Sequence, residues 1–322
     1  MDALSRKCMI SRFKNCVLPK SSFISLFVVS MIGVCLLGCN TVIEPPDPVE
    51  LPEVPERVAN IFKQKYPDAT ETTMRVVEKG NFWEADFKLG SDRYYAGLDS
   101  VEVLRGLRLV NSEVPDSIRS LLTNTSLAKV ELTGYREQVE SFIDTEKQFV
   151  ARYTYQNKEY EMMWTPGLRS YVLNCVPHYK FFGRMYPNYI PENIQAFIAA
   201  ENLRSIGGAM FINDKNERTY RMNAQHAGNN VYDFIFDSKG TLLWTSFNRK
   251  EITNTLNLPA HIQAYLQQME AEYGYKLGSG YEIYYTGGYS LFLQKGVQES
   301  LEVKLDKDGR EVDRVQMIYV NW

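Results

Sequence analysis

The chain has 322 residues, of which 44% are hydrophobic, and 36 Lys and Arg residues against 39 Asp and Glu give a net charge of −3 at pH 7. Nucleic-acid binding depends on a basic surface that neutralises phosphates, so this balance argues against a nucleic-acid partner. Length and apolar content are sufficient for one or two domains, each with a hydrophobic core.

Residues 1–38 have the parts of a secretory signal in order: a basic leader, an apolar run that begins at Phe23, and a small residue before a cut. The end of this run, Leu37-Gly38-Cys39, resembles the signal of bacterial lipoproteins. The resemblance implies that the signal peptide is removed and that Cys39 carries acyl chains such as palmitate. The alternative is an uncleaved membrane helix, but about 15 apolar residues fall short of the roughly 20 that a span needs.

The residues after Cys39 predict where the lipid places the protein. Asn40 follows the cysteine, where an aspartate would favour retention at the inner membrane, so we expect the outer membrane. The acidic cluster that sends some lipoproteins of gut Bacteroidetes to the cell surface is nearly absent, which favours the face toward the periplasm. Residues 39–50 are rich in proline and predict a stiff, extended tether.

Removal of the leader also changes charge and cysteine content. It takes away five basic residues and Asp2, which leaves 31 (36 − 5) Lys and Arg against 38 (39 − 1) Asp and Glu, or about −7. Three of the five cysteines lie in the leader. With Cys39 acylated, Cys175 stands alone, so we expect no disulfide within the chain and a fold stabilised by its core.

A proline pattern recurs four times along the chain. Pro55, Pro115, Pro191 and Pro259 each follow an apolar residue and have apolar residues at positions +3, +6 and +7. Proline suits the first turn of a helix, where its missing N–H would lack a partner anyway, and the apolar spacing lies on one helical face. Each proline therefore predicts the start of a short amphipathic helix, and the recurrence indicates internal duplication.

Strand and turn signals follow these helices. Apolar and polar residues alternate over 82–87 and 231–236, which is typical of strands. Asp237-Ser238-Lys239-Gly240 and Asp306-Lys307-Asp308-Gly309 have the residues of hairpin turns. Together the signals predict an α+β fold, with tandem repeats of a short helix packed on an antiparallel β-meander sheet.

A family resemblance fits these signals. The segments that carry it are Val54-Pro55, Tyr66-Pro67-Asp68-Ala69, Trp83-Glu84-Ala85-Asp86-Phe87, Gly97-Leu98-Asp99 and Val114-Pro115. They resemble the PepSY-like repeats of bacterial lipoproteins, a superfamily that includes β-lactamase-inhibitor-protein-like domains. The resemblance implies repeats 1 and 2 over 51–177, an aromatic linker over 178–189, and repeats 3 and 4 over 190–322. It also implies modules without catalytic residues that bind proteins, inhibit enzymes or act as propeptides.

Catalytic and metal motifs are missing from the sequence, so we predict no enzyme, no cofactor and no metal site. Cys175 and His178 are close enough to suggest a thiolate pair, but a buried thiol with an exposed loop histidine is the favoured interpretation. The segment 306–309 echoes part of a calcium loop but lacks its remaining oxygen ligands, so we interpret it as a hairpin turn.

Two aromatic segments are candidates for partner binding, because Tyr and Arg are enriched at recognition surfaces. The candidates are Tyr179, Phe182, Arg184 and Tyr186 in the first segment, and Tyr284, Tyr285 and Tyr289 in the second. The alternatives are that the first segment joins the two halves of the chain and that the second packs across strands. Ser100 and Ser117, each in an Asp-Ser-apolar sequence, resemble O-glycosylation acceptors of gut Bacteroidetes.

These observations predict a non-catalytic, membrane-anchored lipoprotein that binds an envelope protein or peptide, for example to restrain an envelope hydrolase. The alternative function is a glycan-binding accessory lipoprotein, suggested by the surplus of tyrosine and by Trp83, Trp164 and Trp244.

Overall fold

The computed structural model describes residues 53–141, 148–165, 170–185, 190–226 and 230–321. The predicted signal peptide (1–38), the lipidation site Cys39 and the tether (39–50) lie outside the described residues. The candidate binding residue Tyr186 also lies outside them.

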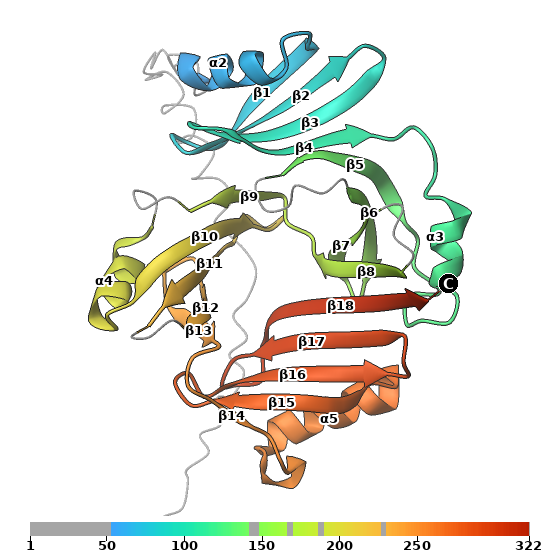
Figure 1. Ribbon diagram of the computed structural model, residues 1–322, viewed down its shortest axis with the longest axis vertical. Helices are drawn as coiled ribbons and strands as arrows, with labels where there is room; N and C mark the ends of the chain where they lie inside the picture. The colour runs from blue at the N-terminus through green and yellow to red at the C-terminus, as the bar shows by residue number, and fades with distance from the viewer. Residues whose placement is uncertain (1–52, 142–147, 166–169, 186–189, 227–229, 322) are drawn as a thin grey trace, which may run out of the picture. The chain divides into compact units, whose positions relative to one another are not determined.

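Most of the described strands belong to one large antiparallel sheet (Figure 1). Its thirteen strands, in spatial order, are β1 (Thr70–Glu78), β2 (Phe82–Leu89), β3 (Asp92–Asp99), β4 (Val103–Leu109), β5 (Thr133–Ser141), β6 (Gln148–Tyr155), β7 (Lys158–Trp164), β8 (Ser170–Pro177), β18 (Glu311–Asn321), β17 (Glu299–Leu305), β16 (Gly288–Lys295), β15 (Lys276–Ile283) and β14 (Arg249–Glu251). We refer to it as the large sheet.

Five further strands form a second antiparallel sheet, which we refer to as the small sheet. In spatial order they are β13 (Leu242–Thr245), β12 (Val231–Phe236), β11 (Arg218–Gln225), β10 (Arg204–Ile212) and β9 (Phe181–Arg184). The segment 178–189, predicted as an aromatic linker, contains β9, which pairs with β10 along its whole length.

Two pairings make the large sheet continuous. β4 pairs with β5, for example through Arg105 and Ser141, and so joins the first two meanders. β8 pairs with β18 through Cys175 and Gln316. The C-terminal strand therefore lies inside the sheet, between β8 and β17.

The helices begin where the prolines predict. They are α2 (Glu56–Lys65), α3 (Asp116–Leu121), α4 (Glu192–Ala200) and α5 (Ala260–Tyr273), and the preceding prolines adopt φ between −52° and −58°. The +3 residues Val58, Ile118, Ile194 and Ile262 are all buried against strands, as the pattern predicts. A short 3₁₀ helix, Thr255–Asn257, precedes α5. Within the described residues, no helix is both long enough and apolar enough to span a membrane.

Both predicted hairpin turns are confirmed. The carboxylate of Asp306 accepts hydrogen bonds from the backbone N–H groups of Asp308 and Arg310, and Gly309 adopts a φ of +78°. Asp237 makes the equivalent bonds in its own turn. These bonds from Asp306 stay within the turn, as in a hairpin.

The predicted fold class is wrong. The described part of the chain is mostly β, with 52% of the described residues in strands, and it does not form an α+β fold of helix-on-sheet repeats. Meanders that follow different helices merge into the large sheet, because β4 bonds to β5 and β8 bonds to β18. The helices are short, 6 to 14 residues, and cover only parts of these sheets.

Candidate functional site

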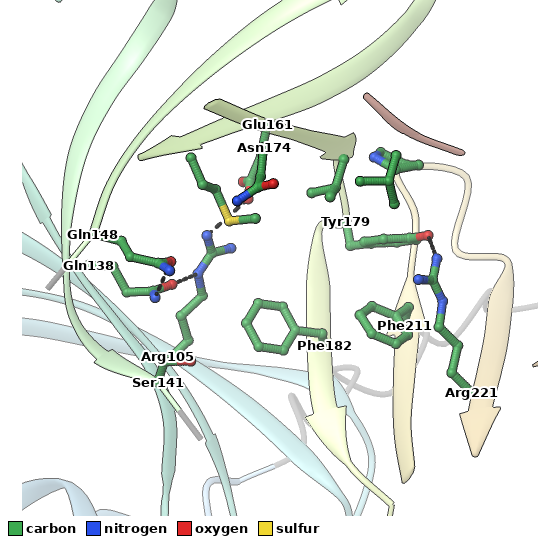
Figure 2. Close-up of a pocket in the computed structure, with 14 residues that line it drawn as sticks. Arg105, Gln138, Ser141, Gln148, Glu161, Asn174, Tyr179, Phe182, Phe211 and Arg221 are labelled. Carbon is green, nitrogen blue, oxygen red and sulfur yellow. Dashed lines mark hydrogen bonds and ion pairs between the residues drawn. The ribbon is translucent and has the colours of Figure 1, made fainter. Parts of the chain in front are cut away.

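A pocket of about 340 Å³ lies between one face of the large sheet and one face of the small sheet (Figure 2). We refer to it as the inter-sheet pocket. The large sheet lines it mainly with Arg105, Gln138, Gln148, Glu161, Met163 and Asn174. Tyr179 before β9 and residues of the small sheet line the other side: Phe182, Phe211 and Arg221.

Strand alternation explains this pocket. Successive side chains of a strand point to opposite faces, so a strand can contribute to a core on one face and to a site on the other. In β7, Met162 belongs to a hydrophobic core, while its neighbours Glu161 and Met163 line the pocket. In the small sheet, Met210 is in a core and its neighbour Phe211 faces the pocket. The pocket thus occupies the space between the two sheet faces opposite these cores.

Arg105, on β4, is the central charged group of the large-sheet wall. Its side chain is only 8% exposed, and its Nη2 lies 2.9 Å from Oε2 of Glu161. Its Nε donates a longer bond of 3.3 Å to Gln138, whose amide in turn donates to Gln148. The guanidinium lies over the ring of Phe182, 5.0 Å from the ring centre, in a cation–π contact. Arg105 therefore ties both sheets together at the pocket.

Glu161 is surrounded by positive groups and hydrogen-bond donors. Its Oε1 lies 2.9 Å from Nδ1 of His178 and 3.8 Å from Nε of Arg152. Burial alone would raise the pKa of Glu161, but Arg105 and His178 outweigh it and hold that pKa below its usual range. The carboxylate is therefore charged at neutral pH and fixes the positions of Arg105 and His178.

Arg221, on β11, organises the opposite wall. Its Nη2 lies 2.5 Å from the hydroxyl of Tyr179 and 2.9 Å from Oδ1 of Asp313. Its guanidinium also lies over Phe211, 4.7 Å from the ring centre. Burial would raise the pKa of Asp313, but Arg221 and Lys304 lower it overall, so this pair too stays ionised. Both walls thus consist of an arginine laid over an aromatic ring and held by a buried acid.

The first aromatic segment reaches this pocket in part. Tyr179 and Phe182 line it, as just described. Arg184 does not line it and forms an ion pair with Glu102 at 3.1 Å.

The second aromatic segment lies elsewhere, at the β15–β16 hairpin. Tyr284 is 53% exposed and Tyr285 39%. The hydroxyl of Tyr285 donates to Glu201 at 2.6 Å, and its ring packs edge-on against Phe197. Tyr289 is 3% exposed and belongs to a hydrophobic core, so its ring is inaccessible to a partner.

The two candidate glycosylation sites differ in accessibility. Ser117 is exposed in the first turn of α3, whereas Ser100 is half-buried in the turn between β3 and β4. Asp99 organises that turn by accepting backbone hydrogen bonds from Val101 and Glu102.

The structure separates Cys175 from His178. Cys175 points into a hydrophobic core, and burial raises the pKa of its thiol to about 12. His178 faces Glu161 beside the pocket, on the other side of the sheet. The prediction of a buried thiol is confirmed, but the prediction of an exposed loop histidine is wrong. His178 is 6% exposed because its ring packs onto Glu161.

Four central residues of the pocket escape prediction from sequence: Arg105, Glu161, Phe211 and Arg221. They belong to no motif and are far apart along the chain. The one available signal is a charged residue inside an apolar strand, such as Glu161 between Tyr160 and Met162. Such a residue is costly to bury unless it is paired, and so marks a site of interest.

The fold and the pocket define a mostly β protein with a polar and aromatic pocket between two antiparallel sheets. No family model and no curated protein matches the chain, so membership of the PepSY-like or lipoprotein families is not confirmed. One solved structure that resembles part of it is a crystal structure of a Bacteroides vulgatus ATCC 8482 protein, provisionally described as periplasmic and of unknown function. The match has 20% identity and a TM-score of 0.22, and covers 42% of this chain and 98% of that one. At this TM-score nothing is transferred from that protein to this chain.

Proposed function

We propose that this chain is a lipid-anchored envelope protein that binds a peptide segment of another protein in the inter-sheet pocket. Attachment to the membrane through Cys39, at the outer membrane and facing the periplasm, is part of this proposal. The proposal of peptide binding rests on the inter-sheet pocket. The sequence resemblance supports it, because the related domains bind other proteins. By binding such a segment, the protein would restrain an envelope hydrolase.

The chemistry of the pocket suits a peptide. Peptides combine apolar side chains with amide N–H and C=O groups, and the pocket offers partners for both. Met163 and Val176 supply apolar contact. The carboxamide of Asn174 lines the pocket and can both donate and accept hydrogen bonds. Sites of this kind use a few placed polar groups to orient a mostly apolar ligand.

The glycan alternative is less well supported by the structure. Trp83, Trp164 and Trp244, which suggest it in the sequence, are between 2% and 4% exposed. In the pocket, guanidinium groups lie over the rings of Phe182 and Phe211. Sugar rings stack on open aromatic faces, and here one face of each ring already has a cationic partner.

A display experiment tests the proposal. A random-peptide display library is panned against the full chain in detergent micelles, and the selected peptides are synthesised and their affinities measured. We expect Phe211→Ala to weaken their binding at least about tenfold, because truncation of a well-packed aromatic contact costs more than about 1.4 kcal/mol. Tyr319→Ala is the matched control, since it removes an exposed aromatic residue that neither lines the pocket nor belongs to the two aromatic segments.

Thermal melts establish that both variants fold. Failure to enrich any peptide over bare micelles would refute peptide binding, and so would equal affinity of the selected peptides for Phe211→Ala and the parent chain. Retardation of the chain in a polysaccharide affinity gel, lost in Phe211→Ala, would instead favour the glycan alternative.

A further inference from the structure

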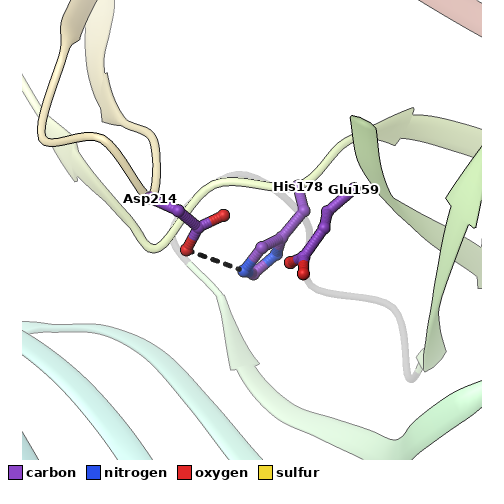
Figure 3. A group of neighbouring side chains, drawn as sticks. All are labelled: Glu159, His178 and Asp214. Atoms are coloured by element: carbon purple, nitrogen blue, oxygen red, sulfur yellow. Dashed lines mark ion pairs between the residues drawn. The ribbon is translucent and has the colours of Figure 1, made fainter. Parts of the chain in front are cut away.

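We propose that His178, Glu159 and Asp214 form a binding site for a divalent transition-metal cation of the zinc type (Figure 3). One ligand atom from each residue lies within 4.8 Å of the other two. Imidazole nitrogen and carboxylate oxygen are ligands that zinc commonly takes, and three protein ligands leave a position for water or a further ligand.

The distances suit a bridging ion better than direct hydrogen bonds. Nε2 of His178 lies 3.9 Å from Oδ1 of Asp214, which is too long for a hydrogen bond. Two ligand atoms on one zinc ion, each about 2.1 Å from it, are about 3.4 Å apart in tetrahedral geometry and at most about 4.2 Å apart. The three ligand atoms lie within 4.8 Å of one another, so closure to the tetrahedral spacing requires shifts of up to about 1.4 Å. Glu159 and Asp214 are both exposed, so their side chains can make these shifts.

Glu159 and Asp214 are acidic residues without a lysine or arginine salt-bridge partner in the part of the chain that the structure describes. Figure 3 shows both carboxylates next to the same imidazole ring. Two negative groups beside one imidazole ring are an arrangement that a divalent cation stabilises.

The second ring nitrogen of His178, Nδ1, is bound by a carboxylate, as is typical of metal-binding histidines. Nδ1 lies 2.9 Å from Oε1 of Glu161, the buried carboxylate that also binds Arg105. A histidine that donates Nδ1–H to a carboxylate presents the lone pair of Nε2 to the metal and is oriented by that bond. Glu161 is therefore a positioning residue for the site.

The backbone holds the three ligands together. Glu159 is on β7, and its carbonyl accepts a hydrogen bond from the backbone N–H of His178 at 2.9 Å. Asp214 is in the turn between β10 and β11, where the Asn213 side chain accepts bonds from the N–H groups of Lys215 and Glu217. A bound ion would thus connect the large sheet to a turn of the small sheet, next to the inter-sheet pocket. The site is independent of whether that pocket binds a peptide.

The test uses the untagged full chain in detergent, titrated with Zn²⁺ by calorimetry and with Co²⁺ by visible absorption. We expect saturable Zn²⁺ binding, together with Co²⁺ bands in the visible region that report nitrogen and oxygen ligation. Asp214→Asn should weaken Zn²⁺ binding at least about tenfold and reduce the Co²⁺ bands. Glu159→Gln, also at an exposed position, should do the same.

Asp308→Asn is the control, because it removes an exposed acid from another hairpin turn and leaves the cluster intact. It should bind Zn²⁺ like the parent chain. Unchanged affinity and spectra in both Asp214→Asn and Glu159→Gln, or no saturable binding in the parent chain, would overturn the proposal. Neither result would bear on the peptide proposal, which is tested by Phe211→Ala.

Discussion

Replacement of Arg105 by methionine should destabilise the protein strongly, because it leaves the charge of Glu161 buried. Both side chains of the pair are at most 8% exposed, so water screens them little. Removing one partner of such a pair costs about 3–5 kcal/mol. Glu161 keeps His178 at 2.9 Å and Arg152 at 3.8 Å, so we expect the lower end, about 3 kcal/mol. For a chain of this size that lowers the melting temperature by about 4–5 °C.

Thermal and urea unfolding of the full chain measure this effect, and Arg75→Met is the matched control. Arg75 also pairs with two acids, Glu84 and Asp86, but its side chain is 55% exposed. Exposed pairs contribute about 0–1 kcal/mol, so the control should lose little. The double variant Arg105→Met/Glu161→Gln should regain part of the loss, since it removes the unpaired charge. A loss in Arg105→Met no greater than in Arg75→Met would refute the reasoning.

Two further predictions concern pH and packing. The pKa values of Glu161 and Asp313 are held below their unfolded values of 4.5 and 3.8, so their stabilisation is present at neutral pH and is lost as pH falls through and below that range. Unfolding free energies between neutral and acid pH should fall accordingly, with a shallower fall in Arg105→Met; an equally steep fall would contradict the role of the pair. Gly183→Ala should cost about 1–3 kcal/mol, because the new methyl group would overlap the buried ring of Phe82. Gly207→Ala is the control, because a methyl group added there would meet no neighbouring atom within 4 Å. It should lower the unfolding free energy by less than Gly183→Ala does in the same melts, and equal losses of stability would contradict the packing argument.

Local elements could be predicted from sequence because their signals are local. The four helix starts follow from Pro55, Pro115, Pro191 and Pro259, since proline is pre-organised for the first helical turn. The hairpin turn at Asp306 follows from side-chain bonds within five residues. Alternation over 82–87 predicts a strand, and β2 covers it.

The arrangement of the strands could not be predicted in the same way. β7 shows the reason: Tyr160, Glu161 and Met162 are all buried, because one face meets a core and the other meets the pocket. A strand covered on both faces loses the alternation that marks which side is inside. The pairing of Cys175 with Gln316 joins segments with many other strands between them, and no local pattern specifies it.

The residues of the inter-sheet pocket could be predicted only in part from the sequence, for a related reason. Tyr179 and Phe182 stand out because aromatic residues cluster around them in the sequence. Arg105, Glu161 and Arg221 come from three separate strands, and only the packing of the two sheets brings them to one pocket.

The central position of β18 has a consequence for how the chain is made. Synthesis delivers the N-terminal end first, so β1 to β8 emerge before the strand that completes their sheet. Until residues 311–321 arrive, the backbone N–H and C=O groups along one side of β8 lack their partner strand. An open strand edge of this kind invites pairing with other chains. A truncation of the last strand would therefore leave two sheet fragments with exposed edges, so the C-terminal residues act as the closing element of the whole fold.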